Sequence, residues 1–278
     1  MQSVIIKPRN EQLKHYIQYF LFFRKTDSNF LTYTTFPNNN LCLAIYKENL
    51  IDYSNQQTIN QCTITERRGK FTSKLYGFHK IPFHVDIHSP LDQVCIIFYP
   101  SALRVFTGES YDNLMQSDHV QDLFPSADTN ALEQLFEEKD FSKRANQLEQ
   151  LLLRHLNIEL PHKLKEALYT ISTSNDQYLT VETLAKQLKI STPSLFRLFK
   201  QQLGQNPKSY LKTIRFRTVL NEVLNKQTTL TDIAHLNQFY DQAHFINDFK
   251  TFSGYSPNQL IHKISVQQTD LTWIYNKK

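Results

Sequence analysis

Side chains that can hydrogen-bond to the edges of DNA bases occur in two groups, about 50 residues apart. The first group surrounds Arg197, and the second lies between Gln242 and Asn247. Arginine can pair with guanine through two hydrogen bonds, and glutamine or asparagine can pair with adenine in the same way. These residue types therefore favour recognition of a base sequence.

Both groups lie within a sequence repeat. The segments LFRLFKQQLGQNPKSYL and HFINDFKTFSGYSPNQLI share a Phe-Lys pair that is followed by a glycine and a proline. The residues matched at an offset of 50 are Phe199 with Phe249, Lys200 with Lys250, Gly204 with Gly254, Pro207 with Pro257 and Leu211 with Ile261. Upstream, Ala185 matches Ala234 at an offset of 49, so the second unit has gained one residue. A short helical unit used twice, with a change of length in a turn, indicates two helix-turn-helix units.

The first unit is predicted to be two short helices joined by a tight turn. In residues 180–188, the apolar side chains recur at i, i+3, i+4 and i+7, which places them on one helical face. Ser191 can cap a second helix over residues 192–203, and Pro193 fits its first turn. Gly204 is placed to end this helix. This is the sequence pattern of a helix-turn-helix.

The second unit has the same plan with a longer turn. Residues 230–236 predict its first helix, and residues 237–241 the turn. Asp241 is a good N-cap for a second helix, which Gly254 ends. Between the units, residues 207–226 predict one long helix of about 30 Å. Successive major-groove faces of DNA are about 34 Å apart, so this helix would place both units on one face of a duplex.

The tandem arrangement resembles the AraC/XylS family of bacterial transcription regulators over about residues 164–262. Most of the resemblance lies in DIAHLNQFYDQAHFINDFKTFSGYSP, with residues 191–210 as the first-unit equivalent. It implies that the second helix of each unit enters the major groove. The base contacts it implies are Pro193, Phe196 and Arg197 in the first unit and Gln242, Ala243, His244 and Asn247 in the second. The exposed positions that complete the predicted DNA-binding set are Ser194, Lys200 and Lys250.

Some positions depart from the usual pattern of the family. Glycine is usual at the position of Gln238, so this glutamine must either adopt a positive φ or reshape the turn. Phe196 and Pro193 stand where polar residues are common. They could contact thymine methyl groups, or they could leave most of the reading in this unit to Arg197. Acidic side chains such as Asp241 place negative charge near DNA in the second unit.

The N-terminal half alternates short apolar or β-branched runs with turns, which indicates a β-rich sandwich or barrel over residues 1–125. Residues 16–23 form one of these runs, although residues 15–23 could equally be a short helix followed by a strand. Residues 126–162 are predicted to be connecting helices and a linker, whose leucines at 148–156 either pack on the N-terminal domain or form a dimer seam. With a tandem helix-turn-helix domain over residues 163–278, the expected fold class is α+β, a β-rich domain followed by an all-α domain.

The N-terminal half is more distantly similar to the sensor-like domain of a subset of the same family. The segments LKHYIQYFLFF, FPNNN before LCLAIY, and VCIIFYPSALRVFTG carry this similarity. The aromatic content and near-neutral charge predict an apolar-lined pocket or an interaction surface, not a catalytic site. His79, His84 and His88 with Asp86 form a metal-like cluster. We interpret its strand residues as the polar face of an antiparallel strand, so no metal is expected.

Charge is distributed unevenly along the 278 residues. Residues 160–278 contain 15 Lys and Arg against 8 Asp and Glu, whereas residues 1–159 contain 16 against 18. Basic charge in the repeat-bearing half suits binding to phosphates. Cys42, Cys62 and Cys95 are odd in number and widely spaced, so a reducing cytoplasm fits better than a disulfide framework or a structural zinc site. Neither a signal peptide nor a membrane-spanning segment is expected.

The sequence thus predicts a cytoplasmic, sequence-specific transcription regulator, an activator or a repressor, that binds double-stranded DNA and needs no cofactor. An enzyme is the rival class, but no G-x-S-x-G motif occurs, and neither paired carboxylates nor an HExxH motif stands out. A ligand-binding or protein-interaction module, whose helices serve a protein partner, is the other alternative. RNA polymerase, a small-molecule effector and a second copy of the chain are further candidate partners.

Overall fold

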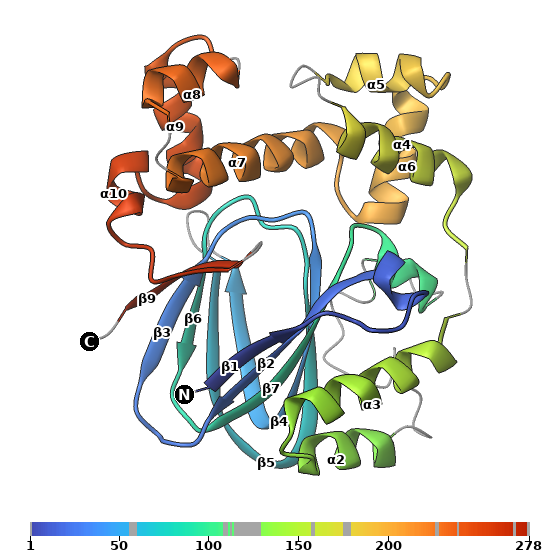
Figure 1. The fold of residues 1–278 in the computed structure, drawn as a ribbon, viewed down its shortest axis with the longest axis vertical. Coiled ribbons are helices and arrows are strands. Elements are labelled where there is room, and N and C mark those ends of the chain that lie inside the picture. The colour runs from blue at the N-terminus through green and yellow to red at the C-terminus, as the bar shows by residue number, and fades with distance from the viewer. Residues whose placement is uncertain are drawn as a thin grey trace.

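The computed structural model describes residues 2–55, 60–107, 111, 113, 129–156, 159–174, 179–225, 228–237, 239–268 and 271–276. In these residues a curled sheet lies beneath a layer of helices (Figure 1). The strands are β1 (Gln2–Ile6), β2 (Ile17–Lys25), β3 (Leu31–Thr35), β4 (Leu41–Asn55), β5 (Asn60–Tyr76), β6 (Phe83–Ile87), β7 (Leu91–Phe98), β8 (Val266–Gln268) and β9 (Leu271–Asn276). Their order in the sheet is β1-β2-β7-β4-β5-β6-β3-β9-β8, and only the β5–β6 pair is parallel among the described strands.

Strand β2 shows why a nearly continuous apolar run forms a strand here. Side chains alternate between the two faces of a strand. Phe20 and Phe22 point into one core, while Leu21 and Phe23 point into another on the opposite face. Both faces are buried, so the sequence shows no polar alternation. A short 3-10 helix, η1 (Leu13–His15), precedes the strand, so that within residues 15–23 only His15 is helical and residues 17–23 belong to β2.

Two helices, α2 (Thr129–Glu137) and α3 (Phe141–Arg154), cover one face of the sheet (Figure 1). Leu148, Leu151 and Leu152 of α3 belong to the same buried core as the sheet residue Phe22. The leucine stripe therefore packs on the N-terminal domain of its own chain, which is one of the two alternatives that the sequence left open.

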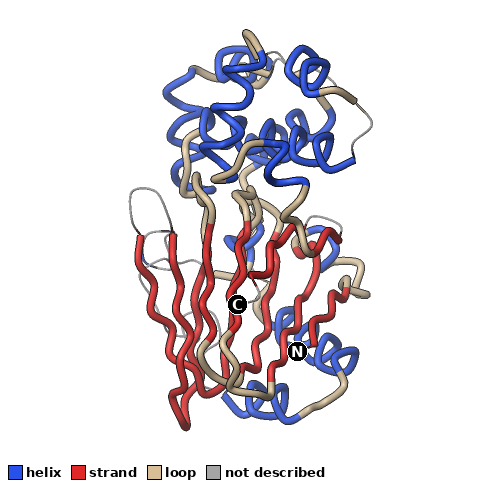
Figure 2. Tube along the Cα trace, turned by 90° about the vertical axis from the view of Figure 1, so that its left-hand side faces the viewer, coloured by secondary structure: helices blue, strands red, loops and turns tan. Residues whose placement is uncertain are grey.

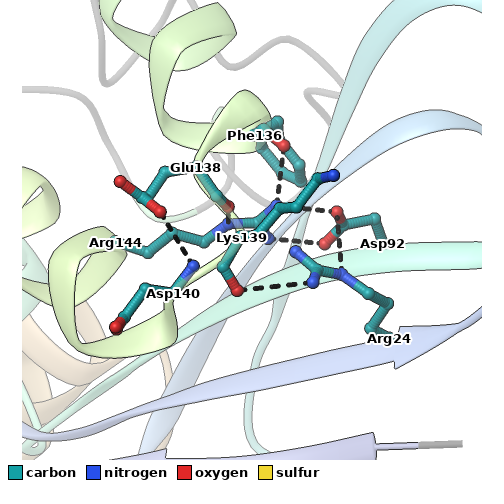
Figure 3. A network of polar contacts seen from close by, with 7 residues as sticks. All are labelled: Arg24, Asp92, Phe136, Glu138, Lys139, Asp140 and Arg144. Carbon is teal, nitrogen blue, oxygen red and sulfur yellow. Dashed lines mark hydrogen bonds and ion pairs between the residues drawn. The ribbon is translucent and has the colours of Figure 1, made fainter.

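A buried arginine joins these two helices to the sheet (Figure 3). Arg144 is fully buried and donates to both carboxylate oxygens of Asp92, at 2.6 and 2.8 Å. It also donates to the backbone carbonyls of Glu138 and Phe136, at 2.6 and 2.7 Å. Arg24 approaches the same carboxylate at 3.5 Å. One guanidinium thus fixes the turn between α2 and α3 and ties it to strand β7.

The helical layer lies across one end of the sheet (Figure 2). Its helices are α4 (His162–Thr173), α5 (Val181–Gln187), α6 (Thr192–Leu203), α7 (Pro207–Asn225), α8 (Leu230–Leu236), α9 (Gln242–Ser253) and α10 (Pro257–Ile261). One core lies among α4, α5, α6 and the start of α7, and a second among the rest of α7 and α8 to α10. The predicted fold class, with two helix-turn-helix units joined by a long helix, is confirmed.

The end of the chain returns to the sheet. Strand β9 pairs antiparallel with β3, with Tyr33 opposite Tyr275 and Thr35 opposite Trp273. The indole of Trp273 stacks on the ring of Tyr33, with centroids 4.6 Å apart. The predicted helix-turn-helix region, residues 163–278, therefore contributes a strand to the N-terminal sheet as well as its helices.

A polar contact joins the two parts of the chain near the middle of the helical layer. The side-chain amide of Asn39 donates to the carbonyl of Tyr210 at 3.1 Å and accepts from Gln205 at 3.3 Å. On the other side, Phe36 and Ile274 pack in the core formed by α7 to α10. The sheet thus contacts both helix-turn-helix units, and α7 crosses between these contacts.

Candidate nucleic-acid interface

The two turns have the same backbone hydrogen bond. The amide of Ile190 donates to the carbonyl of Ala185 at 3.1 Å, and the amide of Phe239 donates to that of Ala234 at 2.9 Å. Both pairs are related by the offset of 49 that the alanines show in the sequence. The repeat is therefore structural as well as sequential.

The caps of the second helices locate the added residue. Ser191 accepts a hydrogen bond from the amide of Ser194, and Asp241 accepts one from the amide of His244. These caps are related by an offset of 50. The extra residue of the second unit is therefore Tyr240, which immediately precedes the cap.

The first turn contains a residue with a left-handed backbone. Lys189 has a φ of 55°, a conformation that costs a non-glycine residue about 1–2 kcal/mol. The equivalent residue of the second unit is Gln238, which lies outside the described residues. The prediction that Gln238 adopts a positive φ or reshapes its turn therefore stays a prediction.

Helix α6 presents most of the predicted first group to solvent. Its buried face consists of Leu195, Phe199 and Leu203. The exposed residues of the predicted set are Pro193, Phe196, Arg197 and Lys200, while Ser194 is half-buried and hydrogen-bonds to the cap. Phe196 is 38% exposed, so the ring is accessible without being fully solvated.

The two basic side chains of α6 differ in their surroundings. Arg197 makes no ion pair or hydrogen bond with any residue that the structure describes, so its five donors are available to a ligand. Lys200 donates to the carbonyl of Gly204 at 3.4 Å, at the far end of the helix from the cap. The side chain of Arg197 is therefore free of internal partners among the described residues, whereas that of Lys200 is directed to the C-terminal end of α6.

Helix α9 buries three phenylalanines, Phe245, Phe249 and Phe252. All five predicted residues of the second group are exposed, and they are Gln242, Ala243, His244, Asn247 and Lys250. Each unit thus brings its own group to one helical surface, and the two groups lie on separate helices.

Two members of the second group are held by neighbours. The amide oxygen of Gln242 accepts from the hydroxyl of Thr231 at 3.4 Å. The ring of His244 accepts from the amide of Tyr240 at 3.4 Å and packs edge-on against Phe239. By contrast, the side chain of Asn247 makes no hydrogen bond within the described part of the chain.

The long helix α7 separates the units and modifies the charge near α9. The ammonium group of Lys212 lies 4.0 Å from the carboxylate of Asp248, which offsets part of the negative charge noted in the second unit. Arg215 lies over the ring of Phe239 at 5.9 Å. With 19 residues, α7 spans about 28 Å.

Tyr240 is a candidate contact that the sequence prediction did not include. Its side chain is 94% exposed, and it stands at the start of α9. A tyrosine hydroxyl can donate to a phosphate oxygen. The sequence did contain a sign of this residue. The offset between the two units changes from 49 to 50 within the turn, which shows that the second turn has one more residue than the first.

The histidine cluster of the N-terminal half shows strand alternation. His84 and Asp86 point to the more open face of β6, where His84 hydrogen-bonds to Thr34 and Asp86 to Gln61. His79 lies apart, stacked on Phe83, and burial lowers its pKa to about 4. Within the described residues, no three His, Cys, Asp or Glu side chains come together as a metal site would require. The hydrogen bonds of His84 and Asp86 fit the interpretation of a polar strand face, but among the described strands β6 is antiparallel only to β3 and pairs parallel with β5.

Among the described residues, no helix combines the length and the apolar character that crossing a membrane requires.

Comparison with protein-family models gives two matches. Residues 184–263, from α5 to the end of α10, match a helix-turn-helix domain family. Residues 6–120 match a domain of unknown function, DUF6597. The helix-turn-helix match covers both units and the helix between them.

Curated relatives are similar to the helical region. The lactose operon transcription activator of Staphylococcus xylosus is 29% identical over 103 residues, 37% of each chain. The transcriptional activator RhaS of Escherichia coli is 30% identical over 79 residues, 28% of each chain. The matches thus span about a third of the length of these relatives.

Solved structures are similar to the chain in part or over most of its length. The C-terminal domain of AraT, a response regulator from Geobacillus stearothermophilus, is 27% identical and covers 40% of this chain and 93% of its own, with a TM-score of 0.36. ToxT from Vibrio cholerae is 10% identical and covers 87% of this chain and 97% of its own, with a TM-score of 0.42.

Proposed function

We propose that this chain, which belongs to the AraC/XylS family of transcription regulators, binds double-stranded DNA and reads two adjacent major-groove segments with α6 and α9. The observation that carries the proposal is the duplicated unit. Each copy has the same turn hydrogen bond, a capped second helix and a solvent-exposed face on that helix. A helical domain without this function could have the same apolar core, but it would not need equivalent residues at a fixed offset in two copies of one unit.

The ten predicted residues are proposed to divide into two roles. Side chains near the start of each second helix would meet base edges, as helix-turn-helix proteins use the N-terminal part of the recognition helix. Arg197 and Asn247 have side chains without partners in the described structure, so they are proposed as the principal base contacts. Lys200 and Lys250, near the ends of their helices, are proposed to contact phosphates.

The direct test is selection of duplexes from fragmented genomic DNA by the purified full-length chain. A shared sequence in two parts is expected, and its affinity should fall steeply between about 50 and 200 mM salt, because each phosphate contact releases counterions. Binding without sequence preference, or no binding, would favour the alternative of a protein-interaction module.

Arg197→Ala is expected to reduce affinity for the selected site by about 1–3 kcal/mol and to relax the preference at one or two base pairs. Lys200→Ala should weaken selected and random duplexes by similar factors, because a phosphate carries no sequence information. Titration of both variants against both duplexes measures the difference. Equal losses on both duplexes for Arg197→Ala would show that it does not read a base.

Tyr240→Phe tests the added residue of the second turn. We expect a loss of affinity of about 0.5–1.5 kcal/mol on selected and random duplexes alike, because the hydroxyl would donate to a phosphate oxygen. The matched control is Tyr169→Phe on α4, where the tyrosine is also exposed but lies outside both second helices. An unchanged affinity for Tyr240→Phe would remove this residue from the interface.

The N-terminal sheet is proposed to regulate DNA binding, through a small ligand or through self-association, without catalysing a reaction. This proposal is supported by the contacts between the sheet and both helix-turn-helix units. Asn39 donates a hydrogen bond to Tyr210 near the start of α7, and β9, which follows the second unit, pairs with β3. A ligand can shift DNA affinity only by its preference for one of two states of the protein. Measuring DNA affinity over a range of protein concentrations separates self-association from a ligand effect.

A further inference from the structure

A cavity of about 130 Å³ lies inside the curled sheet, facing the helical layer. Seven Phe, Tyr and Trp side chains line the described part of its wall, and they are Tyr19, Tyr33, Phe36, Tyr46, Tyr76, Phe83 and Trp273. An engineered cavity of roughly 150 Å³ in another protein binds benzene. The space therefore suits a molecule of about one aromatic ring.

One wall of the cavity comes from the far end of the chain. Trp273 lies on β9, after the second helix-turn-helix unit, and its indole stacks on Tyr33 at an interplanar angle of 11°. Stacked rings in this arrangement present flat faces and edges, which favour an aromatic ligand over an aliphatic one of similar size.

The part of the cavity wall formed by Gln93, Tyr46 and Tyr76, here called the floor, contains a hydrogen-bond acceptor without a partner. Gln93 is 5% exposed, and its amide nitrogen donates to the hydroxyl of Tyr46 at 3.0 Å. Tyr46 in turn shares a hydrogen bond of 2.7 Å with the hydroxyl of Tyr76. The carbonyl oxygen of Gln93 has no hydrogen-bond partner among the residues that the structure describes. Gln93 lines the cavity, so this oxygen can accept a hydrogen bond from a ligand that carries a donor.

The polar groups around the floor carry no charge at neutral pH. Burial raises the pKa of Tyr46 and Tyr76 well above the usual value, and burial lowers the pKa of His79 to about 4. Arg217 of α7 is the charged residue among the described members of the wall. Arg217 already has an interaction partner within the structure, so an uncharged ring with one donor matches the floor better than a carboxylate does.

We propose that this cavity is a binding site for a compact, uncharged aromatic molecule that bears a hydroxyl, with its ring against Trp273 and its hydroxyl donating to Gln93. The inference deepens the proposed regulatory role of the sheet and rests on it for its meaning in the cell. Binding itself is a property of the cavity and is measured without DNA, so the two proposals can fail separately.

Trp273 is the only tryptophan of the 278 residues, so its fluorescence reports on the cavity directly. The probes are phenol, toluene, cyclohexanol and benzoate, added to the full-length protein with excitation at wavelengths that phenol does not absorb. Phenol is expected to change the emission saturably and to bind about tenfold more tightly than toluene, which lacks the donor. Cyclohexanol and benzoate should bind more weakly than phenol.

Gln93→Leu is the test of the acceptor. This substitution should lower the affinity for phenol about tenfold and leave the affinity for toluene unchanged. Tyr169→Leu, at an exposed position on α4, should change neither affinity. The proposal is overturned if phenol gives no saturable response, if cyclohexanol or benzoate binds as tightly as phenol, or if Gln93→Leu affects toluene and phenol equally. The ranking of the four probes on the unaltered chain remains decisive if Gln93→Leu does not fold.

Discussion

Inserting about 5 base pairs between the two half-elements of the selected DNA site is expected to lower the affinity at least about 100-fold. Half a helical turn moves one major-groove segment to the opposite face of the duplex. Only one unit could then contact its half-element. Each base pair that is lost costs about 1–3 kcal/mol, so losing one unit's few contacts exceeds this factor.

The size of this effect depends on α7, which cannot adjust to the new spacing. It is continuous over 19 residues and is anchored at both ends. Tyr210 lies in the core of the first unit, and Phe216 and Leu220 lie in the core of the second. Asn39 and β9 add contacts from the sheet to each side.

The control is a duplex whose spacer has a new sequence but the original length, which should retain nearly full affinity. The two duplexes are compared by direct titration at one salt concentration, because phosphate contacts make affinity strongly salt-dependent. Equal affinity for the lengthened and the original site would show that the two units are not rigidly coupled.

The helical half was predictable because its signals are local. Caps such as Ser191 and Asp241, the helix-ending Gly204 and the spacing of apolar residues each act within a few positions. Helix α6 begins and ends at the predicted residues. The repeat strengthened the prediction, because equivalent positions in the two units indicate the same helix boundaries. The roles of the exposed residues on DNA stay predictions, since they depend on a partner molecule.

The sheet was only partly predictable because its pairings connect distant segments. The alternation of short apolar runs and turns indicated strands, but it did not indicate that β4 and β5, with 15 and 17 residues, pair as a long hairpin. Glu48, with a φ of 60°, lies at the irregularity where the pairing shifts register. An adjustment of this kind leaves little trace in a periodic pattern.

Strand β9 was not predicted, although its segment is rich in the β-branched and aromatic residues that strands favour. The reason is that its partner, β3, lies more than 230 residues earlier in the chain. Without that pairing β9 would pair only with the short strand β8, and β3 would be an exposed edge. The cavity wall at Trp273 was missed for the same reason. The role of Gln93 as an acceptor was not predicted, because the sequence around a single glutamine in an apolar strand does not show which residues surround its side chain.

Arg144→Met is expected to destabilise the sheet domain by about 3–5 kcal/mol. The substitution keeps an unbranched side chain but removes the guanidinium that holds Asp92. It also leaves the carbonyl of Phe136 without its buried donor, which costs about 1–3 kcal/mol. Arg24 remains 3.5 Å from Asp92 and offsets part of the lost attraction, which places the loss nearer the lower end of the range.

Denaturant unfolding followed by the emission of Trp273 measures this loss in the sheet, where the tryptophan lies. The matched control is Arg68→Met, which removes an arginine that is 89% exposed and pairs with Glu66. An exposed pair contributes at most about 1 kcal/mol, so this variant should unfold close to the unaltered protein. If the two variants shifted the transition equally, the turn between α2 and α3 would not depend on the buried guanidinium. A large shift for Arg144→Met alone would show that one side chain holds the connecting helices on the sheet.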